Sequence, residues 1–222
     1  MNAPMISPGD YLRLRAPQAG VLYYPGCGTD WGPLHLFGSH QQITAAIYVD
    51  YAIEREAARR LLTVIPGWDV VAEPEDLTPD YLRVEAWDRC WPDSSEALRV
   101  ARPGSAFGLA SRVGNGSANV EFVFLATEAT QTFSLLHQRD LATSIVVLQD
   151  HVFGCNWSPF GGESLLYQAA RDSAHLPDLL FVAHSTDPWP GYRQVSEYAV
   201  LDGQQHDHAR ALFARDVRHD DR

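Results

Sequence analysis

A short glycine-rich turn is the segment of this chain best suited to holding a ligand. Residues 24–30 read Tyr-Pro-Gly-Cys-Gly-Thr-Asp, and the apolar run at 20–25 leads into this turn. Because glycine has no Cβ, Gly26 and Gly28 let the backbone turn sharply and approach a ligand closely. A helix that begins after such a turn offers free N–H groups to polar ligand atoms. Asp50 follows about 20 residues later, the separation expected of a carboxylate that binds ribose hydroxyls. The pattern indicates a nucleotide-type ligand.

This turn resembles the first motif of the class I S-adenosylmethionine-dependent methyltransferases. That family often has an apolar strand followed by a Gly-Cys-Gly-Thr-Gly segment, and residues 26–29 here read Gly-Cys-Gly-Thr. The resemblance covers residues 20–51. It implies a Rossmann-like fold in which Gly26 and Gly28, with Cys27 between them, lie against S-adenosylmethionine and Asp50 holds its ribose.

Two positions depart from the family's pattern. Tyr24 stands two residues before the first glycine, where the family usually carries an acid, and Asp30 replaces the third glycine. Asp30 adds a charge near the amino-acid end of the cofactor, where it would bind the ammonium group. Two other interpretations of the turn stay open. One is a different nucleotide or small ligand in the same crevice, and the other is a tight strand-to-helix turn without a ligand.

Titratable side chains follow three further apolar runs. Asp150 and His151 come after residues 144–149, Glu128 comes after 120–127, and His184 comes after 179–183. If these runs are neighbouring strands, their side chains converge as a general acid and base. The alternatives are that the histidines are ordinary loop residues and that Glu128 is an acid in the first turn of a helix. A site of two histidines and one acid would suit a metal, but short-range ligand spacing is lacking, so we predict none.

Aromatic residues in the same loops suit contacts with a substrate. Trp157 lies beside the pair Gly161-Gly162, and prolines flank Trp189. Flat aromatic rings can stack on a planar ligand, and an arginine can bind a carboxylate or phosphate through two parallel hydrogen bonds. The alternatives are a small core that plugs the sheet end and a rigid crossing into an edge strand. The candidate substrate contacts are Trp31, Trp157, Trp189, Tyr192 and Arg193.

The order of the predicted elements indicates how these residues are positioned. Apolar runs at 20–25, 44–50, 120–127, 144–149 and 179–183 are typical of buried strands. Helical patterns at 53–64, 128–137 and 163–174 separate several of them. This alternation predicts a single α/β domain over residues 1–222, with a mostly parallel, doubly wound, Rossmann-like sheet. Ligands of such sheets bind beyond the carboxyl ends of the strands, where the strand order reverses.

Other segments fit the edges of this sheet. Residues 80–113 alternate apolar and polar side chains between turns, which predicts an antiparallel β-meander, either an insertion or a sheet edge. Short strands are expected at 11–15 and 68–72, with an antiparallel edge strand at 197–201. The last residues, 203–222, are expected to form a tail that is helical at 208–215.

Composition excludes several classes of function. The chain has 222 residues and a formal net charge of −11, which disfavours duplex nucleic acid and anionic membrane surfaces as partners. It contains no lysine, so Schiff-base chemistry and a Walker-type phosphate lysine are excluded within this chain. Three cysteines without CxxC spacing favour a reducing compartment. Neither a signal-peptide pattern nor a membrane-length apolar run is present, so we expect a cytoplasmic protein.

Three functions fit these patterns. The first is a small-molecule enzyme with a methyltransferase-like fold that binds an S-adenosyl or related nucleotide ligand. The second is a non-catalytic module of the same fold that binds a protein partner through exposed Trp31, Trp157 and Trp189. The third is a nucleotide-handling hydrolase or transferase that uses residues Asp150, His151 and Glu128.

Overall fold

The described part of the chain is built mainly from strands. The structure is a computed structural model, and it describes residues 5–15, 20–27, 33, 43–49, 67–77, 107–114, 116, 119–126, 144–148, 165–172, 176–184, 188–200 and 209–216. The helices within these ranges are α1 (Pro8–Arg15) and α7 (Leu165–Asp172). The strands are β1 (Val21–Pro25), β2 (Ala45–Val49), β3 (Asp69–Leu77), β4 (Phe107–Gly114), β5 (Asn119–Ala126), β6 (Ser144–Leu148), β7 (Leu179–Ala183), β8 (Tyr192–Gln194) and β9 (Arg210–Arg215).

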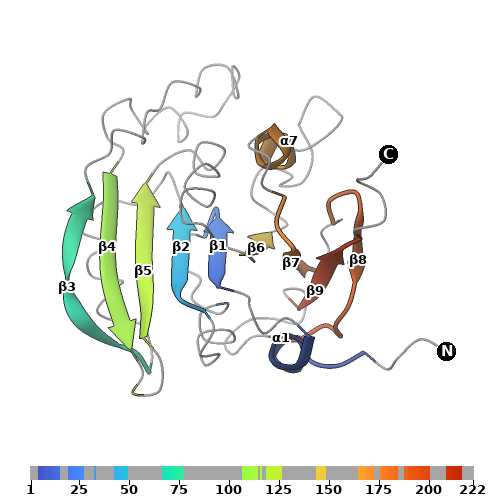
Figure 1. The fold of residues 1–222 in the computed structure, drawn as a ribbon, viewed down its shortest axis with the longest axis horizontal. Helices are drawn as coiled ribbons and strands as arrows, with labels where there is room; N and C mark the ends of the chain where they lie inside the picture. Colours follow the sequence, from blue (N-terminus) through green and yellow to red (C-terminus); the bar gives the residue numbers. More distant parts are fainter. Residues whose placement is uncertain are drawn as a thin grey trace.

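All nine of these strands belong to one mixed sheet. Their order is β3-β4-β5-β2-β1-β6-β7-β9-β8, with β1 in the middle (Figure 1). The five central strands, β5-β2-β1-β6-β7, pair in parallel throughout. The prediction that these five apolar runs are strands pointing the same way is therefore confirmed.

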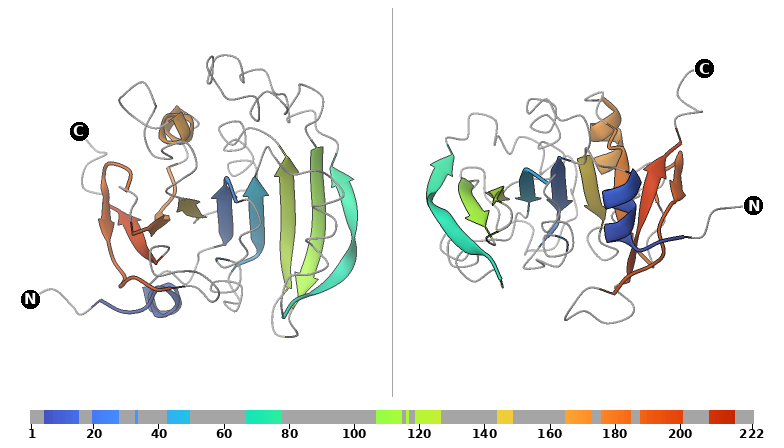
Figure 2. Two further views of the ribbon diagram at one scale, coloured as in Figure 1. Left: turned by 180° about the vertical axis from the view of Figure 1, so that it is seen from behind. Right: turned by 60° about the horizontal axis from the view of Figure 1, so that its bottom comes forward.

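The central strands are buried because both faces of the sheet are covered. Every residue of β1, β2 and β7 is buried, as expected of parallel strands rich in Val, Ile and Leu. Alternate residues enter two separate clusters, with Leu22 and Tyr24 on one face and Val21 and Tyr23 on the other. Leu12 of α1 packs in the first cluster, and Ala170 of α7 packs in the second, so one described helix packs against each face (Figure 2).

Antiparallel strands flank the parallel centre on both sides. β3, β4 and β5 pair antiparallel at one edge, so the part of the predicted meander at 107–113 does lie at an antiparallel edge. Residues 80–106 lie outside the described residues. The strand expected at 68–72 is longer, running from Asp69 to Leu77, and it is the outermost strand of that edge. At the other edge, β9 runs antiparallel between β7 and β8.

The prediction of a strand at 11–15 is wrong, because this segment belongs to helix α1. Ser7 caps the helix: its Oγ accepts a hydrogen bond from the backbone N–H of Asp10 at 3.1 Å and donates one to the Asp10 carboxylate at 2.8 Å. An N-cap serine satisfies a backbone donor that the first helical turn leaves open. This local capping, together with burial of Leu12, outweighs the alternating pattern of the segment.

Two further expectations near the C-terminus are wrong. Residues 210–215 form strand β9 rather than a helix in a tail, because they lie between β7 and β8 in the sheet. Ala, Leu and Arg favour helices, but burial between two strands overrides this weak preference. The edge strand is Tyr192–Gln194 rather than 197–201; in the described part of that segment, 197–200, an isolated bridge joins Ala199 to Arg210. The predicted helix at 163–174 is confirmed as α7, whereas those at 53–64 and 128–137 fall outside the described residues.

Candidate functional site

The carboxyl ends of the parallel strands meet at one edge of the sheet. Pro25 of β1 pairs with Val49 of β2, which pairs in turn with Leu125 of β5. On the other side of β1, Leu148 of β6 pairs with Val182 of β7. The segments that leave these strands therefore start along one line, which we call the carboxyl edge.

The strand order reverses at β1. From β1 the sheet extends through β2 to β5 in one direction, and through β6 to β7 in the other. In open parallel sheets such a reversal leaves a crevice beyond the carboxyl ends, because the connections on its two sides leave in opposite directions. Gly26 and Cys27 follow β1 directly, so they lie at this point.

The turn after β1 has the geometry that a close backbone approach requires. Gly26 has a φ of 66°, in the left-handed region that glycine occupies without steric cost. The N–H groups of Gly26 and Cys27 both donate to the Val49 carbonyl oxygen, at 2.7 and 3.3 Å. These bonds attach the turn to the end of β2. Cys27 is 1% exposed, and its thiol packs in the same cluster as Tyr24.

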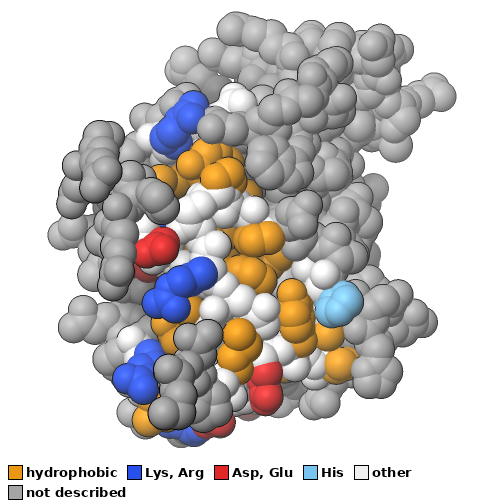
Figure 3. Space-filling model, turned by 90° about the vertical axis from the view of Figure 1, so that its right-hand side faces the viewer, with side chains coloured by type: hydrophobic (Ala, Val, Ile, Leu, Met, Phe, Trp, Pro, Cys, Tyr) orange, Lys and Arg blue, Asp and Glu red, His pale blue; other side chains and the backbone are white. Residues whose placement is uncertain are grey.

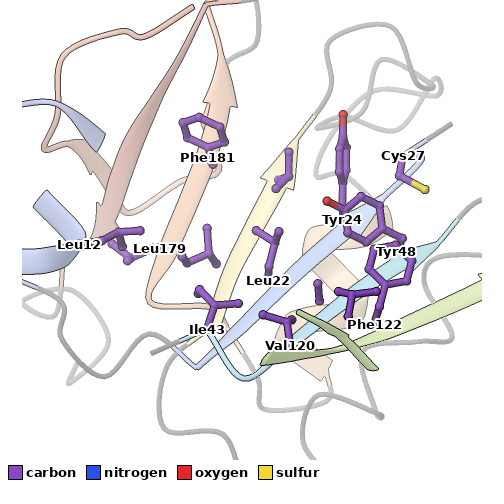
Figure 4. Packing of buried hydrophobic residues seen from close by; sticks show 14 of the residues in the cluster. Leu12, Leu22, Tyr24, Cys27, Ile43, Tyr48, Val120, Phe122, Leu179 and Phe181 are labelled. Carbon is purple, nitrogen blue, oxygen red and sulfur yellow. The ribbon is translucent and has the colours of Figure 1, made fainter. Parts of the chain in front are cut away.

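A row of aromatic side chains crosses the sheet beneath this turn. The ring centroids of Phe122 and Tyr48 are 4.8 Å apart, and those of Tyr48 and Tyr24 are 5.5 Å apart. The guanidinium carbon of Arg210 lies 5.7 Å from the Tyr24 ring and 5.9 Å from the Phe181 ring. Figure 4 shows Tyr24, Tyr48 and Phe122 packed together, with Cys27 at the same end of the cluster.

Arg210 is the residue of this region that sequence reasoning missed. It is 1% exposed, and one of its terminal nitrogens donates to the Tyr24 hydroxyl at 3.1 Å. It pairs with Ala183 at the end of β7, so it stands at the carboxyl edge. A charged side chain is almost never fully buried, so no pattern marked this arginine. Only the knowledge that 210–215 is a buried strand, which the structure supplies, would have pointed to it.

Trp189, a candidate substrate contact, lies in the core. It is 1% exposed and packs with the cluster that includes Ala170. Its ring meets those of Tyr167 and Tyr192 edge-on, at 5.5 and 6.4 Å between centroids. It joins α7 to the segment before the edge strand β8, which corresponds to the alternative of a rigid crossing into an edge strand.

Tyr192 and Arg193 lie near the amino ends of the parallel strands, whereas the glycine turn lies at their carboxyl ends. Tyr192 pairs with Arg215, whose N–H donates to the carbonyl of Asp178, the residue before β7. The length of β7 separates this level from the carboxyl edge, a distance of roughly 15 Å at the usual rise per strand residue. The Tyr192 hydroxyl donates to the Pro177 carbonyl, and Arg193 is exposed. The structure therefore does not bring these two residues together with Gly26 and Cys27.

His184 is at the carboxyl edge but on its outer part. It follows β7, is exposed, and its N–H donates to the Ala209 carbonyl at 2.7 Å. Its ring meets that of Tyr198 at 5.0 Å between centroids. Partial burial raises the pKa of Tyr198, because a phenolate is less well solvated there. On the face at the β8 end of the sheet, hydrophobic side chains are interspersed with charged ones (Figure 3).

The other predicted site residues fall outside the part of the chain that the structure describes. They are Gly28, Asp30, Trp31, Asp50, Glu128, Asp150, His151 and Trp157. Among the described residues, no group of three or more His, Cys, Asp or Glu side chains is placed to hold a metal ion. Within the same ranges, neither helix is long and apolar enough to cross a membrane.

The carboxyl edge combines a backbone turn of high curvature, a buried arginine and a row of aromatic rings. The reversal of strand order places the start of this turn where ligands of open parallel sheets bind. Comparison with known protein families, curated proteins and solved structures finds no match.

Proposed function

We propose that this chain is a small-molecule enzyme with a methyltransferase-like fold, which binds an S-adenosyl or related nucleotide ligand at the carboxyl edge. The observation that carries this proposal is the position of Gly26. It has a positive φ, directly follows β1, and stands where the strand order reverses. That combination is the usual setting of the first phosphate- or ribose-binding turn in nucleotide-binding α/β proteins.

The strand order supports a doubly wound, Rossmann-like arrangement. Numbered one to five along the chain, the parallel strands are β1, β2, β5, β6 and β7. Across the sheet their order is β5-β2-β1-β6-β7, which is three, two, one, four, five in that numbering. The Rossmann fold has this same order for its first five strands. Right-handed connections would then place the segments after β1 and β2 on one face and those after β6 on the other.

Asp50 is the proposed ribose ligand. It directly follows Val49, so chain geometry holds the two Cα atoms about 3.8 Å apart. Val49 is also the residue whose carbonyl accepts both N–H groups of the glycine turn. A ligand that rests on Gly26, Cys27 and Gly28 would therefore have the Asp50 carboxylate within reach. We propose that Asp30 and Trp31, which come next along the chain, contact the same ligand.

Acid–base chemistry by Asp150 and His151 is the second candidate. They come two and three residues after Leu148, where β6 ends beside β1 across the reversal point. Glu128 comes two residues after the end of β5 and would approach from the opposite side. A hydrolase or transferase that acts on the bound nucleotide would use these side chains. A protein-binding surface is favoured less, because Trp189, one of its three tryptophans, is buried.

Ligand binding by purified protein tests the proposal. Titration calorimetry and thermal unfolding are measured with S-adenosylmethionine and with S-adenosylhomocysteine. A ligand that binds only the native state raises the melting temperature, by mass action. Asp50→Asn is expected to weaken binding roughly 10- to 100-fold, because hydrogen bonds to a charged acceptor are lost. Arg193→Ala is the control at the opposite edge and should leave the affinity unchanged.

Two results would contradict the proposal. One is no rise in melting temperature with either compound or with adenine nucleotides at millimolar concentration. The other is an equal loss of affinity in Arg193→Ala and Asp50→Asn. For the second candidate, His151→Ala should abolish turnover of the bound nucleotide while binding survives, and loss of binding as well would count against it.

A further inference from the structure

The hydrogen bond between Arg210 and Tyr24 joins two strands that are not neighbours. β6 and β7 lie between β1 and β9 in the sheet. At the usual spacing of strands, the two backbones are roughly 14 Å apart. The Arg210 and Tyr24 side chains together cover this distance: the guanidinium lies by the Phe181 ring of β7 and donates to the Tyr24 hydroxyl. Few side chains are long enough to make such a contact.

Tyr24 is coupled closely to the glycine turn. It precedes Gly26 by two residues, and both Tyr24 and Cys27 pack in the cluster on the α1 face. The ring of Tyr48 lies against Tyr24 from the β2 side, and the next residue, Val49, accepts the N–H groups of the turn. The turn is therefore held by β2 through backbone bonds, and by β9 through Arg210 and Tyr24.

We propose that Arg210 is a positioning residue for the ligand site, and that it acts through the Tyr24 hydroxyl to hold the Gly26–Cys27 turn in its left-handed geometry. This inference rests on the proposed function for its biological meaning, because the turn matters only if a ligand binds there. Its physical content is independent of any ligand. A charged hydrogen bond in a buried, low-dielectric setting resists rotation of the Tyr24 ring, and that ring packs in the same cluster as Cys27.

The thiol of Cys27 reports on this turn directly. Because it is 1% exposed, a thiol reagent reaches it only when the turn opens. The experiment uses the full chain with Cys90→Ser and Cys155→Ser, so that Cys27 is the only thiol. The rate of its reaction with a disulfide reagent is measured under native conditions, and the equilibrium constant for global unfolding is measured for each variant.

Three variants separate positioning from general stability. Arg210→Met removes the cation and keeps an unbranched side chain, and Tyr24→Phe removes only the hydroxyl. Phe213→Leu is the matched control, because Phe213 is on the same strand but packs on the other face. Loss of a hydrogen bond to a charged group changes an equilibrium constant roughly 10- to 100-fold. We expect Arg210→Met to raise the Cys27 reaction rate by that factor and Tyr24→Phe to raise it in the same direction.

The double variant provides the sharpest readout. If Arg210 acts through the hydroxyl, Arg210→Met with Tyr24→Phe should react no faster than Arg210→Met alone, because both changes remove one interaction. The inference is overturned if the two single changes raise the Cys27 reaction rate by factors that multiply in the double variant. It is also overturned if the Cys27 reaction rate of every variant, Phe213→Leu included, changes in proportion to the equilibrium constant for global unfolding. If Arg210→Met does not fold, the Cys27 reaction rate of Tyr24→Phe still tests the inference.

A ligand arm distinguishes this inference from the proposed function. If S-adenosylmethionine binds the parent protein, Arg210→Met should weaken its binding while Phe213→Leu does not. If no ligand binds, the proposed function fails, and the Cys27 rates still decide whether Arg210 positions the turn.

Discussion

Replacing Gly26 by alanine tests the central feature of the site. An L-residue in the left-handed region costs roughly 1–2 kcal/mol, and Gly26 has a φ of 66°. Alanine also restricts the unfolded chain, which offsets about 0.4–1 kcal/mol of that cost. The net expectation for Gly26→Ala is a loss of about 1 kcal/mol in the free energy of unfolding. For a chain of this length, that corresponds to a fall in melting temperature of roughly 2–4 °C.

Gly67→Ala is the matched control for the backbone cost. Gly67 has a φ of 74°, and a Cβ built there meets no atom within 4 Å. It precedes β3 at the outer edge of the sheet, far from β1 in the strand order. Urea denaturation should show similar losses for both variants, whereas calorimetry should show that only Gly26→Ala weakens S-adenosylmethionine binding. The reasoning is refuted if Gly26→Ala is as stable as the parent, or if Gly67→Ala weakens the ligand equally.

Two further predictions concern the C-terminal strands. Ser196→Ala should cost roughly 1–3 kcal/mol, because the buried Ser196 Oγ accepts the Leu212 N–H at 2.8 Å; faster hydrogen exchange at Leu212 would confirm it, and unchanged exchange would contradict it. Tyr198→Phe should reduce the loss of stability at alkaline pH. The raised pKa of Tyr198 means that the folded state keeps its proton longer than the unfolded state, so stability falls as the pH rises through that range. The prediction is refuted if the melting temperatures of the parent and of Tyr198→Phe fall by the same amount between pH 8 and 11.

Local pattern was enough to locate the parallel strands. The runs at 21–25, 45–49 and 179–183 are short, apolar and bounded by turn residues, and each is a buried strand. Their common direction followed from the helical patterns between them. The same reasoning placed Gly26 at the carboxyl edge, because a glycine that directly follows a central strand has nowhere else to lie.

Local pattern failed where burial and capping decided the outcome. Residues 210–215 include good helix formers. They form a strand because they pair with β7 on one side and with β8 on the other. Residues 11–15 alternate like a strand, but the Ser7 cap starts a helix before them. Tyr192 and Arg193 follow β7, which ends at the carboxyl edge. Because β8 runs parallel to β7, these two residues start β8 at the opposite side of the sheet, near the amino ends of the parallel strands.

The sequence by itself determined the five parallel strands at the centre of the sheet and the glycine turn that follows the first of them, because those features depend on neighbouring residues. Only the tertiary structure decided the order of the strands and the contact of Arg210 with Tyr24, which are 186 residues apart. A hydrogen bond that crosses two intervening strands depends on the whole sheet being assembled. For that reason, no short stretch of sequence could have indicated it.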